Sequence, residues 1–208
     1  MKIDILMATF NGEKYLRDQI DSILNQSFKD FRLLISDDCS TDSTREILNE
    51  YVKKDDRVIV FLQDKNLGVV KNFEYLMKKV EQEYFMFSDQ DDVWKKDKIQ
   101  NSINMMNEKN CDLVYTNLEV VDSELNTLED SYWRLKEFEK KVKKYNNFES
   151  LYLNNFVTGC TMLVKSKWID KILPFPENSK YILHDYWTAL VISKNRKNGI
   201  FRRTSGNV

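Results

Sequence analysis

The stretch Phe85-Met86-Phe87-Ser88-Asp89-Gln90-Asp91-Asp92 joins a short apolar run directly to three carboxylates. An apolar run of this length that ends in a polar turn is typical of a buried strand in a parallel sheet. Two unit charges 4 Å apart repel by roughly 4 kcal/mol at an effective dielectric near 20, so a bound cation would relieve the turn. Mg²⁺ and Mn²⁺ prefer oxygen ligands, commonly carboxylates together with substrate phosphates. The turn therefore predicts a site for a metal ion and a diphosphate, with a solvated acidic turn as the alternative for this motif alone.

The pattern of apolar strand, polar turn and amphipathic helix repeats along the first half of the chain. We expect strands over residues 3–10, 31–36, 58–62 and 84–88. We expect helices over residues 15–26, 43–52 and 70–80, and Ser43-x-x-Glu46 matches a capping box. This alternation favours an α/β fold with a mostly parallel sheet flanked by helices. Ligands bind outside the carboxyl ends of such strands, where the polar turns 9–12, 37–42 and 89–92 fall.

The composition excludes several classes of protein. The 208 residues carry a net charge of −1, which gives no basic field for nucleic acid, and no apolar run reaches the ~20 residues of a membrane span. The turns lack the glycine-rich motifs of dinucleotide and P-loop sites. We expect no signal peptide. Cys39, Cys111 and Cys160 are predicted to be free thiols in a reducing compartment, and the single His184 argues against a histidine-rich metal site.

The second half of the sequence is less regular. We expect a helix over 98–108, strands over 112–121 and 156–164, a short helix over 168–173 and a helix that begins at His184. Residues 129–147 are polar and predict a surface excursion, and residues 195–208 predict a basic, weakly ordered tail. No internal repeat or linker divides the chain, so we expect a single domain over residues 1–208.

Four motifs resemble the inverting glycosyltransferases of family 2, which have the Rossmann-like GT-A fold. They are, in order, Ala8-Thr9-Phe10-Asn11, Asp37-Asp38-Cys39-Ser40-Thr41-Asp42, Asp89-Gln90-Asp91-Asp92 and His184-Asp185-Tyr186-Trp187. The last motif, with Asn66-Leu67-Gly68 and Thr158-Gly159-Cys160, is most similar to the rhamnosyltransferase-like branch. Ala8 departs from the usual proline, and residues 201–208 look like a shortened form of a loop that usually carries a histidine. The resemblance implies a nucleotide-sugar-binding half over 1–95, a smaller acceptor-binding half over 96–194 and a short tail.

The resemblance implies a metal-dependent donor site. Asp91 would ligate a divalent cation, Mn²⁺ or Mg²⁺, and Asp89 would bind the ribose or assist the metal. Asp92 would lie behind these two carboxylates. Lys71 would approach the diphosphate from the start of a helix. The alternatives are an ordinary turn carboxylate for Asp91 and a solvated side chain for Lys71.

The resemblance also implies how the nucleotide base is held. Asp38 would accept a hydrogen bond from the imino N–H of uracil or thymine, which both bases carry. Ala8 and Phe10 would line the same pocket, with plain core packing as the alternative for both. Asp37 and Asp42 are expected to shape the turn, because aspartate side chains bond nearby backbone groups.

On the acceptor side, the resemblance makes Asp185 the catalytic base that deprotonates the acceptor hydroxyl. An N-terminal helix cap is the alternative for this residue. His184, Trp187 and Gly159 would contribute to the acceptor side, with His184 as a neighbour that shapes the site. Sugar rings would stack on Trp94, Trp133 or Trp187, although most tryptophans in such a chain belong to the core.

The predicted function is transfer of a sugar from a UDP- or dTDP-sugar to a glycan or lipid-linked acceptor, in bacterial surface polysaccharide synthesis. The predicted location is the cytoplasm, with peripheral membrane contact through the basic run 140–144 or, alternatively, a solvated helix face there. Two other functions stay open. One is a nucleotide-sugar-binding relative weakened by its short C-terminus. The other is a sugar nucleotidyltransferase, for which Asn11-Gly12-Glu13-Lys14 is a poor phosphate loop.

Overall fold

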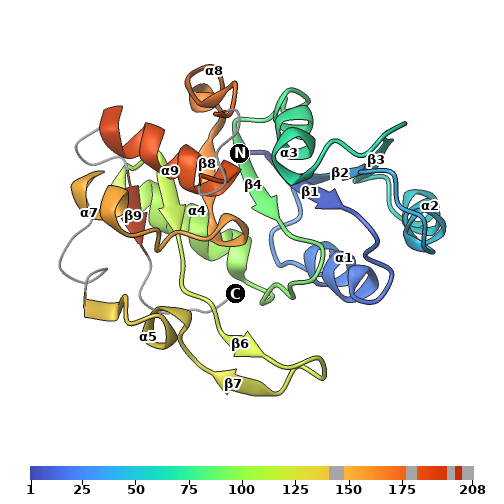
Figure 1. Cartoon of the computed structure of the whole chain (residues 1–208), viewed down its shortest axis with the longest axis horizontal. Coiled ribbons are helices and arrows are strands. Elements are labelled where there is room, and N and C mark those ends of the chain that lie inside the picture. Colours follow the sequence, from blue (N-terminus) through green and yellow to red (C-terminus); the bar gives the residue numbers. More distant parts are fainter. Residues whose placement is uncertain (141–147, 177–181, 196–199, 203–208) are drawn as a thin grey trace.

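A mixed seven-stranded sheet forms the centre of the protein in the computed structural model, which describes residues 1–140, 148–176, 182–195 and 200–202 (Figure 1). The strands follow the spatial order β3-β2-β1-β4-β8-β5-β9, and only β8 runs against the others. Their bounds are β1 Ile3–Thr9, β2 Phe31–Asp37, β3 Val58–Leu62, β4 Tyr84–Ser88, β5 Leu113–Tyr115, β8 Leu163–Lys165 and β9 Ile200–Arg202. The predicted mostly parallel α/β fold is therefore confirmed.

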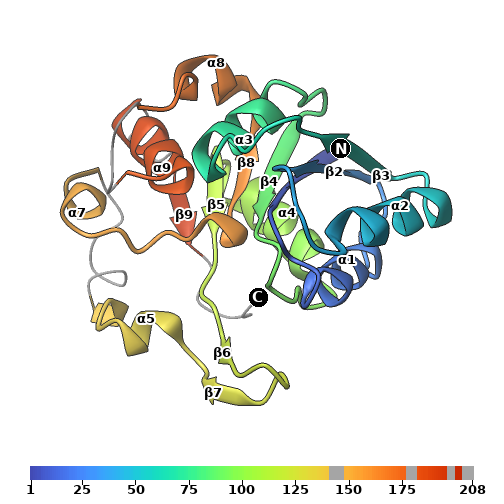
Figure 2. The same cartoon turned by 45° about the vertical axis from the view of Figure 1, so that its right-hand side comes forward.

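Helices cover both faces of the sheet and enclose two apolar cores (Figure 2). One core contains side chains of α1 (Leu16–Leu24), α2 (Thr44–Lys54) and α4 (Lys98–Lys109). The other contains side chains of α3 (Val69–Met77), α8 (Ile169–Ile172) and α9 (His184–Asn195). Side chains alternate along β1, so that Ile5 and Met7 enter the first core and Leu6 enters the second. Both faces are apolar for this reason, which explains the nearly continuous apolar strands of the sequence.

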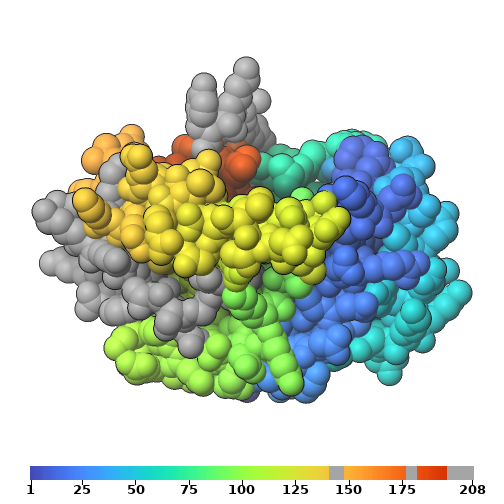
Figure 3. All heavy atoms as spheres, turned by 90° about the horizontal axis from the view of Figure 1, so that it is seen from below, coloured from blue at the N-terminus to red at the C-terminus, as the bar shows by residue number. Residues whose placement is uncertain are grey.

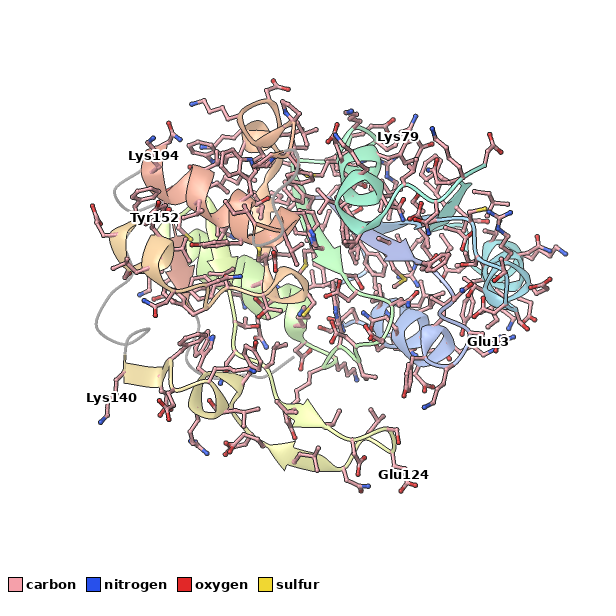
Figure 4. All side chains as sticks on the ribbon, in the orientation of Figure 1. Glu13, Lys79, Glu124, Lys140, Tyr152 and Lys194 are labelled. Atoms are coloured by element: carbon pink, nitrogen blue, oxygen red, sulfur yellow. The ribbon has the colours of Figure 1, made fainter. Side chains whose placement is uncertain are left out.

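A small two-stranded hairpin projects from the sheet beside α5 (Tyr132–Leu135), as Figure 1 shows. Its strands are β6 (Val120–Val121) and β7 (Thr127–Glu129), and Glu124 lies at its tip and points away from the sheet (Figure 4). The prediction of one strand over 112–121 is therefore wrong. Asn117 redirects the chain, because its side chain donates to Ser131 Oγ at 2.9 Å and accepts from the backbone N–H of Trp133 at 3.2 Å.

The predicted strand over 156–164 is also largely wrong. Only its end belongs to β8, and the preceding residues form a 3₁₀ turn, η1 (Gly159–Thr161). A second 3₁₀ turn, η2 (Ser166–Trp168), precedes α8, and α7 (Phe148–Leu153) carries the exposed aromatic Tyr152 (Figure 4). The predicted capping box fails as well, because Ser43 makes no capping hydrogen bond and Asp42 Oδ1 accepts from the N–H of Thr44 instead, at 3.0 Å.

The end of the chain contributes more than the expected polar tail. Ile200–Arg202 form β9 and pair in parallel with Leu113–Tyr115 of β5, so part of the tail extends the sheet. The basic run 140–144 lies outside the described residues except for Lys140, as do 196–199 and 203–208. Among the described residues, we find no helix with both the length and the apolar character needed to cross a bilayer.

Candidate functional site

A cavity of about 420 Å³ lies at the carboxyl ends of the central parallel strands. It brings together five of the residues predicted to bind the donor and metal. The lining residues are Ala8, Thr9, Phe10, Asp38, Asn66, Gly68, Val69, Asn72, Phe73, Asp89, Gln90 and Asp91. Lys71 is not among them, and its side chain is nearly half exposed, with the ammonium paired with Glu74 at 3.1 Å. Contact of Lys71 with the diphosphate therefore stays a prediction.

Strand register explains why these turns meet. Thr9 at the end of β1 lies opposite Asp37 at the end of β2, and Met7 lies opposite Ser88 at the end of β4. Because all three strands run in the same direction, the turns that follow them leave from one edge of the sheet. The edge is then closed by a hydrogen bond from the N–H of Asp38 to the carbonyl of Thr9, at 2.8 Å.

The second turn holds its shape through the carboxylates of Asp37 and Asp42. Asp37 is fully buried and accepts from the guanidinium of Arg45 at 2.6 Å and from the N–H of Ser40 at 3.1 Å. Asp42 accepts from the N–H groups of Glu13 and Thr44 at 3.1 and 3.0 Å. Both residues therefore shape the turn, as expected from their short side chains.

Asp38 has a structural role that the sequence did not indicate. Its Oδ1 accepts from the N–H of Leu67 at 2.7 Å, and its Oδ2 accepts from the N–H of Gly68 at 2.8 Å. Gly68 has a φ of +79°, which only glycine adopts without strain, and so the loop can turn back onto the carboxylate. Each carboxylate oxygen keeps a second lone pair, so Asp38 can still accept a hydrogen bond from a ligand in the cavity.

The acidic turn after β4 combines burial with mutual repulsion. Burial raises the pKa of Asp89 to about 7, and the charges of Asp92, Asp185 and Asp91 add to this effect. Burial also raises the pKa of Asp92, while a hydrogen bond with Cys160 opposes the rise. Both pKa values are raised because no nearby positive charge among the described residues fully offsets the burial and the mutual repulsion of these carboxylates.

The donor atoms present here fit a divalent cation. One oxygen each of Asp89 and Asp92 and the sulfur of Cys160 lie within 4.8 Å of one another. Asp92 Oδ2 is buried and has no hydrogen-bond partner among the residues that the structure describes. The carboxylate of Asp92 therefore lies beside that of Asp89 rather than behind it. Asp91 borders the cavity as well, and it also lines a second cavity on the other side of the turn.

Two glutamines that sequence reasoning missed hold the acidic turn in place. The side-chain amide of Gln90 accepts from the N–H of Phe10 at 2.9 Å and donates to its carbonyl at 3.2 Å. Gln19 Nε2 donates to Ser88 Oγ at 2.7 Å and to the carbonyl of Asp89 at 3.0 Å. A signal existed for Gln19, because it lies on the apolar face of its helix, three residues after Leu16.

Asp185 approaches the same site from the other half of the chain. It is the second residue of α9 and is half-buried, and its Oδ2 accepts from the N–H of Gly159 at 3.0 Å. A Cβ atom on Gly159 would lie 3.1 Å from His184 Nε2 and 3.2 Å from the Cβ of Asp185. A larger residue here would therefore press on His184 and Asp185, which glycine avoids. The charge of Asp185 also contributes to the raised pKa of Asp89, which places the two carboxylates in one electrostatic site.

His184 is enclosed by aromatic rings. Its ring stacks on Phe73 with centroids 3.9 Å apart and meets Phe87 edge-on at 4.8 Å. Neither ring nitrogen has a hydrogen-bond partner among the described residues, and burial lowers the imidazole pKa to about 4. The side chain is therefore neutral near pH 7 and packs beside Asp185, which agrees with its expected role as a neighbour that shapes the site.

The predicted sugar-stacking tryptophans belong to the core. Trp133 is 4% exposed and donates from Nε1 to the carbonyl of Phe156 at 3.0 Å, and Trp94 is 3% exposed. Trp187 packs against the second core and donates to the carbonyl of Ile172 at 2.9 Å. The indole of Trp133 is enclosed by packing, which argues against stacking on a sugar. Trp187 is only half-buried, and Trp94 also lines a cavity beside the acidic turn.

A second cavity of about 470 Å³ opens on the other side of the acidic turn. Its walls come from the segment around α1, from the acidic turn itself and from the hairpin, including Tyr15, Asp92, Leu118 and Leu125. Figure 3 shows the yellow hairpin region reaching across to the blue N-terminal half on this face. Asp91 therefore stands between two hollows, one at the strand ends and one beneath the hairpin.

Comparison with known proteins gives a family match over most of the chain. The family model described as "Glycosyl transferase family 2" matches residues 4–173. The dTDP-rhamnosyl transferase RfbG of Shigella flexneri is 34% identical over 191 residues, covering 87% of this chain and 63% of that protein. The putative teichuronic acid biosynthesis glycosyltransferase TuaG of Bacillus subtilis is 34% identical over 114 residues, covering 55% of this chain and 45% of that protein. The chain spans 45% to 63% of the length of the first four curated relatives it matches.

Solved structures show the same fold. TarS of S. aureus in complex with UDP-GlcNAc aligns with a TM-score of 0.77 at 22% identity, covering 100% of this chain and 57% of that one. The mannosyltransferase PcManGT of Pyrobaculum calidifontis, in complex with GDP-Man and Mn²⁺, aligns with a TM-score of 0.72 at 14% identity, covering 98% of this chain and 54% of that one. These alignments confirm the predicted GT-A fold.

Proposed function

The chain belongs to glycosyl transferase family 2, and we propose that it moves a sugar from a UDP- or dTDP-sugar to an acceptor hydroxyl with inversion at the anomeric carbon. The observation that carries this proposal is that Asp89 and Asp91 of the acidic turn line the cavity at the strand ends, while Asp185 lies close enough for its charge to raise the pKa of Asp89. A relative named as a dTDP-rhamnosyl transferase and a structural neighbour with bound UDP-GlcNAc support the choice of donors. We further propose that the product is a bacterial surface polysaccharide.

We assign the base to the strand-end cavity and the metal to the acidic turn. Asp38 would accept the imino N–H of the base, between Ala8 and Phe10. Asp91 would hold the Mn²⁺ or Mg²⁺ ion from the cavity wall, and Asp89 would assist it. An oxygen of Asp92 lies within 4.8 Å of an oxygen of Asp89, whereas Asp91 is not part of that cluster of donor atoms. Such an ion supplies positive charge to the diphosphate leaving group.

We assign the proton transfer to Asp185. The acceptor oxygen forms a bond to the anomeric carbon while the bond from that carbon to the diphosphate oxygen breaks, and its electron pair leaves with the diphosphate. The hydroxyl proton passes to Asp185 Oδ1 or Oδ2. The N–H of Gly159 at 3.0 Å fixes the carboxylate for this task, and a positioned base of this kind contributes typically 10²–10⁴-fold to the rate.

The nucleotidyltransferase alternative has less support. A triphosphate loop needs free backbone N–H groups. Here the N–H of Asn11 donates to Ser40 Oγ at 2.9 Å and that of Gly12 donates to Thr44 Oγ1 at 2.8 Å. These donors are consumed inside the protein, so the loop after β1 cannot cradle a triphosphate in this conformation.

Calorimetric titration of UDP and dTDP, each with and without Mn²⁺, tests the donor site. We expect metal-dependent binding of at least one nucleotide, and its loss in Asp91→Ala. Sugar transfer is then measured with the matching donors, where Asp185→Asn should abolish transfer yet leave nucleotide binding nearly intact. Equal loss of binding and transfer would make Asp185 structural. Binding without transfer by the wild type, with every donor and acceptor tried, would favour the weakened binding relative.

We also propose an acceptor and a location for the protein. A glycan or a lipid-linked glycan would enter from the side of Asp185, and the protein would work in the cytoplasm, with peripheral contact at the inner face of the membrane. Co-sedimentation with vesicles that contain anionic lipid tests the membrane contact. Recovery of all the protein in the supernatant would refute it.

A further inference from the structure

Lys98 is a buried cation beneath the acidic turn. It is the first residue of α4 and is only 5% exposed. Its ammonium donates to the carbonyl of Cys160 at 2.5 Å and lies 4.4 Å from the centroid of the Trp94 ring. Among the described residues no carboxylate forms an ion pair with it. Lysine is almost never buried without a charge partner, so this side chain calls for an explanation.

The partners of Lys98 are the carboxylates of the acidic turn, at longer range. Burial raises the pKa of both Asp89 and Asp92, and the charge of Lys98 opposes that rise in each. Cys160 connects the groups, because its carbonyl binds Lys98 while its sulfur lies within 4.8 Å of the oxygens of both aspartates. The ammonium is thus fixed beside the atoms that fit a divalent cation.

We propose that Lys98 is a resident cation that makes binding of the divalent ion depend on the donor diphosphate. This inference rests on the proposed function. A fixed positive charge repels a second cation in the same acidic site. The diphosphate brings negative charge that outweighs the repulsion, so the ion and the donor bind together more strongly than either binds alone. Lys98 is a positioning residue, because it acts through the charge of the site and its ammonium is bound to the Cys160 carbonyl.

The direction in which the affinity for the metal changes distinguishes this role of Lys98 from a structural one. Removing the ammonium should strengthen binding of the metal alone, whereas a structural defect would weaken it. Lys98→Gln removes the charge and keeps an N–H donor for the Cys160 carbonyl, and Lys98→Met removes both. Lys96→Met is the matched control, because Lys96 is an exposed residue two positions before Lys98. This variant also removes one positive charge from the chain.

The experiment is calorimetric titration of the intact chain with Mn²⁺, alone and with saturating UDP or dTDP. We expect both Lys98 variants to bind Mn²⁺ alone about tenfold more tightly than the wild type, as removal of a unit charge near a partly screened ion predicts. Lys96→Met should match the wild type, and circular dichroism should show that each variant is folded.

Several outcomes would overturn the inference. Unchanged or weaker binding of Mn²⁺ alone by the folded Lys98→Gln would show that the ammonium does not oppose the ion. If neither variant folds, equal affinity of the wild type for Mn²⁺ with and without nucleotide refutes the proposed coupling. Absence of any Mn²⁺ binding by the wild type, even with nucleotide, would instead refute the proposed metal-dependent function, and this inference with it.

Discussion

His184 provides a stability prediction that can be followed at a single residue, because the chain has only one histidine. Burial among aromatic rings lowers its pKa to about 4 in the folded protein, against about 6.5 in an unfolded chain. The unfolded chain therefore takes up this proton at a higher pH than the folded protein does. The contribution of neutral His184 to stability is complete above pH 6.5 and is lost as the pH falls toward 4.

The magnitude follows from the two pKa values. A difference of roughly 2.5 pKa units corresponds to about 3 kcal/mol in total, since one unit is worth about 1.4 kcal/mol. Between pH 7 and pH 5 the linkage relation gives a loss of about 2 kcal/mol in the free energy of unfolding. Asp89 and Asp92 have raised pKa values, so they act in the opposite direction over this range. A variant that lacks only the imidazole is needed to isolate the effect.

The assay is urea unfolding of the wild type and of His184→Phe at pH 7 and pH 5. Phenylalanine retains a ring against Phe73 and cannot titrate, and the opposing aspartates are present in both proteins. We expect the wild type to lose about 2 kcal/mol more than the variant on acidification. NMR of the lone imidazole should show no titration of the native state above pH 5. A native midpoint near 6.5, or equal losses in both proteins, would refute the reasoning.

Three further predictions concern the site and the frame that supports it. Gly159→Ala should destabilise the fold by about 1–3 kcal/mol, measured by urea unfolding, and lower the transfer rate by displacing Asp185. Asp4→Asn should lower stability by about 3 kcal/mol in the same assay, since the buried Asp4 accepts from Arg32 at 2.8 Å. Calorimetry should show Mn²⁺ affinity rising from pH 6 to pH 8, because Asp89, with a pKa of about 7, must lose its proton to bind the ion; a flat profile would exclude it as a ligand.

The first half of the fold could be predicted from sequence because its signals are local. Each of the first four strands is an apolar run that ends at a polar turn, and each following helix has its apolar residues on one face. The parallel register then brings the turns together, so that Asp38, Asp89 and Asp91 meet at one cavity. The local apolar pattern, together with the rule that ligands bind at the carboxyl ends of parallel strands, was sufficient to predict this part of the site.

The second half could not be predicted in the same way, because its conformation depends on contacts distant in sequence. The apolar run over 156–164 satisfies a strand pattern, yet Gly159 turns there to reach Asp185. Residues 112–121 leave the sheet where Asn117 bonds Ser131 and the backbone of Trp133. A pattern of apolar residues carries no information about such side-chain contacts.

Some residues of the site could not be recognised from their residue type. Gln90 and Lys98 gave no chemical signal, since glutamine and lysine usually face solvent. Gln90 nevertheless pairs with both backbone groups of Phe10, and Lys98 is buried beneath the carboxylates. Gln90 and Lys98 both support the acidic turn, and both do so through contacts that exist only in the folded chain. Electrostatics predicts a buried cation near a cluster of carboxylates, but it does not predict which residue supplies that cation.

The turn Gly159–Thr161 explains how residues from the two halves of the chain can meet at one site. The N–H of Gly159 holds Asp185, and the carbonyl of Cys160 holds Lys98, while the Cys160 sulfur lies beside Asp89 and Asp92. An extended strand would point consecutive N–H and C=O groups toward its neighbouring strands, so it could not bind both partners this way. The 3₁₀ turn therefore sets the separation between the proposed base and the proposed leaving-group site. Displacements of about 1 Å in such geometry can cost about 10²-fold in rate, which explains why this turn interrupts an otherwise suitable strand.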